Sequence, residues 1–223
     1  MVNVEIDSKI KDQISIMALP SNTANKAEAF KNEVEGKIQK LIEEFSDGKI
    51  SKEQFHAIYE RYTQQLAIAN QAMLSGNNKG VADAQTGPGT IAMRNALMGK
   101  ALGMVIYHHK SGTILETLGD FDVAVTKISS TLNDFTMLLD SGKLLEAKTQ
   151  KIEEQQWILF TPGTFTTIVT LFRNEPSKMQ SQELKRLHHD FENANQNIIS
   201  KEVVDKDKLG YPFVVIIRQR FKK

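Results

Sequence analysis

The stretch that decides the fold begins with GMVIYHHKSGTILETLG (103–119) and continues, after a segment at 120–140, with LLEAKTQKIEEQQWILFTPGTFTTIVTLF (144–172). Apolar residues in the two quoted segments alternate or form short runs, which is typical of strands, whereas in 120–140 they recur every three or four residues, which is typical of a helix. Turn residues at 110–112 and 162–163 separate neighbouring strands. The sequence therefore predicts an α+β module with two strands, a helix, three strands and a last long helix from Pro176.

The three later strands differ in polarity. The third, at 144–153, carries Glu146, Lys148 and Gln150 on one face, and a strand this polar suits the edge of a sheet. The fourth, at 156–161, and the fifth, at 164–172, are apolar on both faces. These two strands are therefore predicted to be central and buried.

The helix predicted at 120–140 carries one narrow apolar stripe, and Asp120 suits its N-cap. The stripe has spacings of four and three residues and consists of Phe121, Val125, Ile128, Leu132, Phe135 and Leu139. Such spacing is close to that of a coiled-coil seam, so the stripe predicts contact with a partner helix. The alternative is that the helix packs only on its own sheet, because ordinary amphipathic helices look similar.

In the N-terminal third, the spacing of apolar residues predicts two amphipathic helices, at 21–45 and from Ser51 to about residue 74. The turn Ser46-Asp47-Gly48-Lys49 joins them. Ser51 and Gln54 form a capping-box pattern at the start of the second helix. The segment SGNNKGVADAQTGPG (75–89) lacks apolar periodicity and is interpreted as a linker, and a short helix with Leu97 and Leu102 on its apolar side is expected from Thr90. The predicted domains are a helical hairpin at 1–74, the linker at 75–89, an α+β domain at 90–200, and a C-terminal extension at 201–223 with a strand-like run at 212–218 and a basic tail.

Over residues 90–199, this order of elements resembles the roadblock/dynein light-chain family of profilin-like αββαβββα domains. The resemblance rests on the glycine-turned hairpin VIYHHKSGTILETLG, the amphipathic helix after Asp120, the run ending in TFTTIVTLF, and the terminal helix. It implies a five-stranded antiparallel sheet in the order 2-1-5-4-3, with the middle helix on one face and the first and last helices on the other. It also implies a homodimer in which third strands pair edge to edge and middle helices pack side by side. Family members often regulate or scaffold small Ras-like GTPases.

The third strand permits a specific pairing in such a dimer. If two copies pair antiparallel around Ala147, Glu146 of one faces Lys148 of the other. Each opposite-charge pair contributes about 0.2–1 kcal/mol, enough to favour a register but not to drive assembly. The alternative is that these charges protect the edge from pairing, which is the usual use of lysine there.

Composition narrows the class of protein. The chain has 223 residues, 40% hydrophobic residues, a formal net charge of +1 and no cysteine, which excludes disulfides and thiolate chemistry and gives no electrostatic basis for binding nucleic acid. The N-terminus has no long apolar run typical of a signal peptide, and the longest apolar run, at 213–217, is too short to span a membrane. A cytoplasmic protein is expected.

No constellation predicts catalysis, so we expect no enzyme, no cofactor and no metal. His108-His109 and His188-His189 are adjacent pairs, which suit neither a strand nor a helix metal site. The loop around Gly48 lacks the ligands of a calcium site, and Gly87-Pro88-Gly89-Thr90 is not a phosphate loop. Trp157, the only tryptophan, is interpreted as a core residue, with an interface anchor as the alternative.

The expected function is therefore that of a non-catalytic, homodimeric protein-interaction module that regulates or scaffolds a small Ras-like GTPase in signalling. The alternative is a small-molecule sensor domain of the PAS or GAF type, which requires an apolar pocket between sheet and helix. A third reading is a structural oligomer assembled through the N-terminal hairpin.

Overall fold

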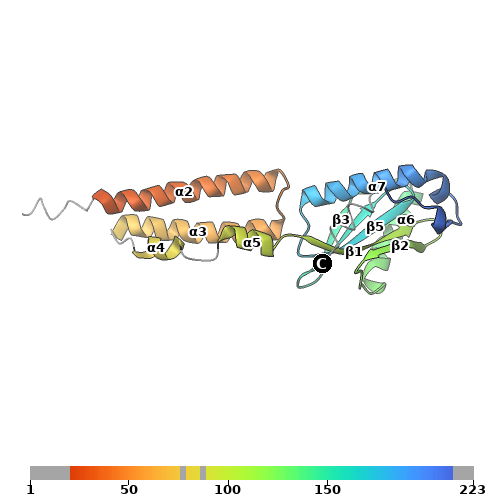
Figure 1. Cartoon of the computed structure of the whole chain (residues 1–223), viewed down its shortest axis with the longest axis horizontal. Coiled ribbons are helices and arrows are strands. Elements are labelled where there is room, and N and C mark those ends of the chain that lie inside the picture. Colours follow the sequence, from red (N-terminus) through yellow and green to blue (C-terminus); the bar gives the residue numbers. More distant parts are fainter. Residues whose placement is uncertain (1–20, 76–78, 86–88, 213–223) are drawn as a thin grey trace, which may run out of the picture. The chain divides into compact units, whose positions relative to one another are not determined.

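The computed structural model describes residues 21–75, 79–85 and 89–212, and these residues form two compact units (Figure 1). The helical unit contains the described residues up to Glu44 together with Phe55–Arg94. The sheet unit contains Phe45–Gln54 and the described residues from Asn95 onward. No helix in the described ranges is long and apolar enough to cross a membrane.

The helical unit is built from α2 (Ser21–Ser46), α3 (Lys52–Ser75), α4 (Lys79–Gln85) and most of α5 (Thr90–Ala96). The helices predicted at 21–45 and from Ser51 to residue 74 are confirmed to within one residue. The apolar faces of the helices supply the buried core of this unit, which includes Ala27, Phe30, Val34, Leu41, Ile58, Tyr62, Ala69, Ala72, Val81 and Ala84.

The segment interpreted as a linker at 75–89 contains helix α4, a difference from the sequence interpretation. Val81 and Ala84 are buried, while Arg61 and Gln65 of α3 both donate hydrogen bonds to the Ala84 carbonyl oxygen, at 3.3 and 2.9 Å. A seven-residue helix is too short to persist by propensity alone, so packing stabilises it. Two small apolar residues three positions apart are too weak a signal to show as periodicity.

The sheet unit contains β1 (Lys100–His108), β2 (Thr113–Gly119), β3 (Lys148–Glu153), β4 (Gln156–Pro162) and β5 (Thr166–Arg173). The order is β2-β1-β5-β4-β3 and every neighbouring pair is antiparallel. This confirms the α+β fold, the predicted strand order, the edge position of the third strand and the central position of the fifth.

One helix covers each face of the sheet (Figure 1). The side chains of α6 (Thr126–Asp140) pack on one face with Val105, Ile158, Phe160, Val169 and Leu171. Those of α7 (Lys178–Ile199) pack on the other, where their partners include Met104, Ile106, Leu159, Ile168 and Phe172. The family resemblance implies that the helix predicted from Thr90 shares the α7 face of the sheet. The helix found there, α5, contributes no buried residue.

Two boundaries differ from prediction because tertiary contacts override local pattern. Helix α6 begins at Thr126, and Asp120 does not cap it; instead the Asp120 N–H donates to the Leu102 carbonyl at 2.9 Å. The backbone there lies against Gly103, where an added Cβ would sit 2.4 Å from the Asp120 carbonyl carbon. The sequence pattern assigned Leu102 to the helix from Thr90, but Leu102 lies in β1. Helix α5 ends earlier, at Ala96, where the Asn174 side chain donates to the carbonyl oxygens of Ala96 and Met98.

The turn of the N-terminal hairpin belongs to the sheet unit. The predicted capping box is present, with the Ser51 N–H donating to Gln54 Oε1 and the Gln54 N–H to Ser51 Oγ. The Met179 N–H at the start of α7 donates to the Gly48 carbonyl at 3.0 Å, and the Glu53 N–H donates to a Glu175 carboxylate oxygen at 2.8 Å. Residues 45–54 therefore fold with the sheet rather than with the rest of the hairpin.

The C-terminal extension is described as far as Pro212 and contains the short 3-10 helix η1 (Lys206–Lys208). Leu209 is buried, and the Tyr211 ring stacks on Phe191 with centroids 5.8 Å apart. The predicted strand at 212–218 and the basic tail lie, apart from Pro212, outside the described residues.

Candidate functional site

The leading candidate surface is formed by the outer side of α6 and the edge strand β3, and we refer to it as the α6–β3 surface. The two elements are joined by side-chain contacts: Lys127 Nζ lies 2.6 Å from Glu153 Oε1, and Lys148 Nζ donates to Thr131 Oγ1 at 3.2 Å. In the sheet formed by the described residues, β3 pairs only with β4. None of the described strands pairs with its outer edge, and an edge of this kind can accept another strand.

The structure separates the predicted stripe into a buried and an exposed part. Ile128, Leu132 and Phe135 are buried against the sheet, so the stripe packs mainly on its own domain and these three side chains are not available to a partner. Phe121 and Leu139 are partly buried, and Phe121 packs on the same cluster. Val125 is 68% exposed and remains a candidate contact residue.

The third strand is shorter than predicted. It begins at Lys148, so Glu146 and Ala147 precede it, although all three side chains are exposed. A pairing centred on Ala147 therefore falls outside β3 in this structure. A strand partner would meet the backbone of Lys148–Glu153 instead.

Two exposed apolar residues on this surface were not predicted. Met137 of α6 is 69% exposed, and Leu144, between α6 and β3, is 100% exposed. Met137 lies off the stripe at two residues from Phe135, and Leu144 was included in the third strand, so neither stood out in the sequence. Exposed side chains of this size can each contribute about 1.5–3 kcal/mol if they become fully buried at an interface.

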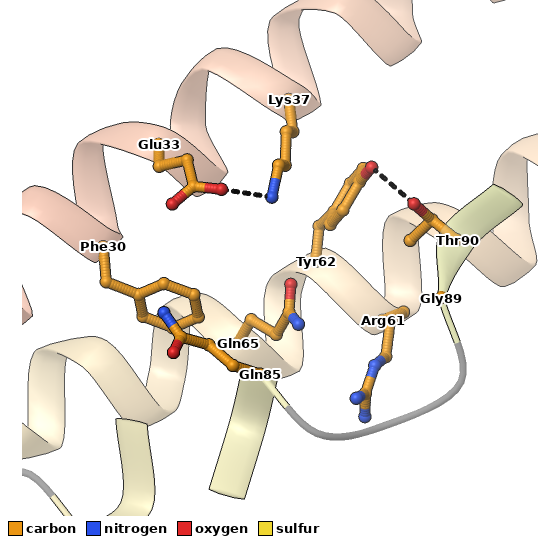
Figure 2. A pocket seen from close by; sticks show the side chains of 9 residues that line it. All are labelled: Phe30, Glu33, Lys37, Arg61, Tyr62, Gln65, Gln85, Gly89 and Thr90. Carbon is orange, nitrogen blue, oxygen red and sulfur yellow. Dashed lines mark hydrogen bonds and ion pairs between the residues drawn. The ribbon is translucent and has the colours of Figure 1, made fainter. Parts of the chain in front are cut away.

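A second feature is a polar groove on the helical unit (Figure 2). It has a volume of about 290 Å³, and its walls come from α2, α3, the end of α4, and the residues before and within α5. Its lining residues are Phe30, Glu33, Lys37, Arg61, Tyr62, Gln65, Gln85, Gly89 and Thr90. Lys37 pairs with Glu33, and the Tyr62 hydroxyl donates to Thr90 Oγ1 at 3.3 Å.

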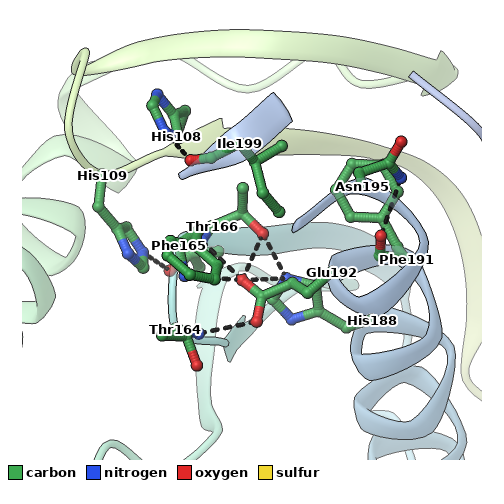
Figure 3. A network of polar contacts seen from close by, with 11 residues as sticks. His108, His109, Thr164, Phe165, Thr166, His188, Phe191, Glu192, Asn195 and Ile199 are labelled. Carbon is green, nitrogen blue, oxygen red and sulfur yellow. Dashed lines mark hydrogen bonds and ion pairs between the residues drawn. The ribbon is translucent and has the colours of Figure 1, made fainter. Parts of the chain in front are cut away.

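The third feature is a buried polar network around Glu192 of α7 (Figure 3). Its carboxylate accepts hydrogen bonds from the backbone N–H groups of Thr164, Phe165 and Thr166, each at 2.8 Å, and from the Thr166 hydroxyl at 2.9 Å. An added Cβ at Gly163 would lie 2.6 Å from the carboxylate, so glycine is needed for this approach. The network fastens the β4–β5 turn to α7.

His188 completes this network, one turn before Glu192. Its Nε2 lies 2.7 Å from Thr166 Oγ1 and 3.8 Å from Glu192 Oε1. Burial lowers the pKa of His188 to about 4 even though Glu192 acts in the opposite direction, so the imidazole is neutral near pH 7. Thr166, His188 and Glu192 are all buried, which prevents proton transfer to a molecule in solution and indicates a structural role.

The adjacent pair His188-His189 does not by itself reveal this network in the sequence. The available signal was the four-residue spacing of His188 and Glu192, on the same side of α7 as Leu184, Leu187 and Phe191. Two polar residues among apolar inward positions indicate a buried pair.

The two histidines of the first hairpin, His108 and His109, are held on opposite faces of the sheet. His108 Nε2 bonds to the Ile199 carbonyl at 2.8 Å and His108 Nδ1 to the Ser111 hydroxyl at 2.8 Å. His109 Nε2 bonds to Thr167 Oγ1, and burial is the main cause that lowers the His109 pKa. In the described part of the chain, no three histidine, aspartate or glutamate side chains lie close enough together to hold a metal ion.

Trp157 is partly buried and packs against the core beneath α7, which agrees with its interpretation as a core residue. Lys151 Nζ lies 5.5 Å from the centre of its ring.

Comparisons of the whole chain with protein-family models, with curated proteins and with solved structures gave no match.

Proposed function

We propose that this protein is a non-catalytic, homodimeric protein-interaction module and that two copies meet through the α6–β3 surface. The observation that carries this proposal is the edge of β3, which no described strand covers, together with two strongly exposed apolar side chains, Met137 on α6 and Leu144 between α6 and β3. A free edge gives main-chain pairing, and neighbouring apolar side chains supply the burial that pairing alone lacks.

The interior of the sheet unit favours an interaction module over a sensor domain. Between the sheet and α6, Phe135 and Phe160 meet edge to face with ring centroids 6.1 Å apart, and both are buried. A sensor of the PAS or GAF type needs an apolar cavity at this place. Packed aromatic rings fill this part of the interior, which favours recognition at the surface.

We further propose that the dimer regulates or scaffolds a small Ras-like GTPase. The support is the resemblance of residues 90–199 to roadblock domains, together with the strand order that the resemblance implies and the sheet has. The charged α6–β3 surface and the hairpin offer separate candidate contact areas for such a partner.

The dimer and the partner are tested separately. Light scattering during size-exclusion chromatography should give twice the chain mass at micromolar concentration, and a monomer at high micromolar concentration would refute the homodimer. Ras-like GTPases from the same genome, loaded with GDP or a GTP analogue, should be captured by the immobilised full chain. Capture equal to that of an unrelated immobilised protein would remove the GTPase proposal while leaving the dimer intact.

A further inference from the structure

We propose that the groove of the helical unit binds a small molecule carrying an oxyanion, either a carboxylate or a phosphate group. This site belongs to the helical unit, whereas the α6–β3 surface belongs to the sheet unit, so it does not depend on the proposed dimer. Two cationic side chains, Lys37 and Arg61, line the groove against one acidic side chain, Glu33, so the lining has an excess of positive charge. Tyr62, Gln65 and Thr90 add groups that form hydrogen bonds.

Arg61 is the residue that gives the groove its preference for an oxyanion. A guanidinium has five N–H donors in a planar fork, and the Arg61 group uses one nitrogen in a long 3.3 Å bond to the Ala84 carbonyl. Its remaining donors suit a carboxylate or a phosphate, which accept two parallel hydrogen bonds from one guanidinium. Lys37 is already paired with Glu33, so it contributes positive electrostatic potential to the groove rather than a direct contact with the ligand.

The groove is partly organised before any ligand arrives. Arg61 and Gln65 both donate to the same carbonyl oxygen, that of Ala84. Tyr62 donates to Thr90, as Figure 2 shows. Phe30 and Tyr62 are buried and line the groove as separate aromatic side chains. A groove of about 290 Å³ limits the ligand to a compact molecule, and these two side chains favour one that also has an apolar part.

The test is an NMR titration of the full-length chain with two probes, inorganic phosphate and benzoate. Saturable shifts of the Arg61 Nε–H and Gln65 side-chain amide signals are expected, and the stronger probe identifies the class of oxyanion. Arg61→Gln should weaken binding about tenfold or more, because it removes a bidentate charge-assisted contact. Arg61→Lys, which keeps the charge and loses the fork, should weaken it less.

Arg186→Gln is the matched control, because Arg186 is an exposed arginine of α7 whose guanidinium lies 3.7 Å from Asp190. It should leave the titration unchanged. The proposal is overturned if neither probe gives saturable shifts at the groove. It is also overturned if Arg186→Gln weakens binding as much as Arg61→Gln, which would indicate unspecific anion binding. Circular dichroism confirms that each variant retains its helices.

Discussion

Replacing His188 with glutamine should change how the stability of the sheet unit depends on pH. The imidazole is buried, and its pKa in the folded protein is about 4, below the value of about 6.5 expected for the unfolded chain. The folded state therefore resists protonation that the unfolded state accepts. The stability due to this difference is fully present above pH 6.5 and is lost progressively as the pH falls to 4.

The size of this effect follows from the shift. A difference of roughly 2.5 pKa units corresponds to about 3 kcal/mol of unfolding free energy. Glutamine at position 188 retains a donor for the Thr166 hydroxyl but does not titrate. The gap in stability between wild type and His188→Gln should therefore shrink by about 3 kcal/mol between pH 7.5 and pH 4.

Urea unfolding followed by the fluorescence of Trp157, the only tryptophan, measures this gap at each pH. His189→Gln provides the control, because His189 is the adjacent residue on α7 and its side chain is exposed. This control should follow the pH dependence of the wild type. The reasoning is refuted if His188→Gln loses stability in acid as steeply as the wild type does.

Three further predictions concern the stability of the sheet unit. Glu192→Gln should lower the unfolding free energy by roughly 3 kcal/mol, because three backbone N–H groups lose a charged acceptor, and a loss under about 1 kcal/mol in urea unfolding would contradict this role. Gly163→Ala should lower the unfolding free energy by about 1–3 kcal/mol in the wild type but by little in a Glu192→Ala background, because the added methyl group meets the Glu192 carboxylate. Equal losses in both backgrounds would show that the carboxylate is not the obstacle. Phe135→Ala should cost about 3–5 kcal/mol, whereas Met137→Ala, two residues away on the exposed side of α6, should change stability by less than about 0.5 kcal/mol; similar losses would contradict the assigned faces.

The parts of the fold that local pattern determines were predictable. Strand polarity placed the third strand at an edge and the fifth in the centre, because a central strand must be apolar on both faces. The helices at 21–45 and from Ser51 follow from apolar spacing and the Ser51–Gln54 capping box.

The parts that depend on contacts between distant residues were not. The late start of α6 results from the approach of the backbone at Asp120 to Gly103, which no window around residue 120 reveals. Amphipathic spacing showed that one side of α6 is buried but not what covers it, and Ile128, Leu132 and Phe135 proved to face their own sheet. The exposure of Met137 and Leu144 likewise depends on the docking of α6.

The position of residues 45–54 also changes how the role of the hairpin is tested. Deleting residues 1–74 would remove the Gly48 and Glu53 contacts to α7 and Glu175, and so would destabilise the sheet unit itself. Loss of assembly in that truncation would not identify the hairpin as an oligomerisation module. Point substitutions on exposed surfaces avoid this difficulty.

The most direct test of the central claim is the mass of the Met137→Lys/Leu144→Lys variant by light scattering. Both side chains are strongly exposed, so lysine is tolerated in the monomer but places two charges from each subunit in a dimer interface. The matched control is Val203→Lys, at an exposed apolar residue (83%) outside the α6–β3 surface. We expect a dimer for the wild type and the control and a folded monomer for the double variant. A double variant that remains a dimer at the same concentration would contradict the α6–β3 surface as the interface.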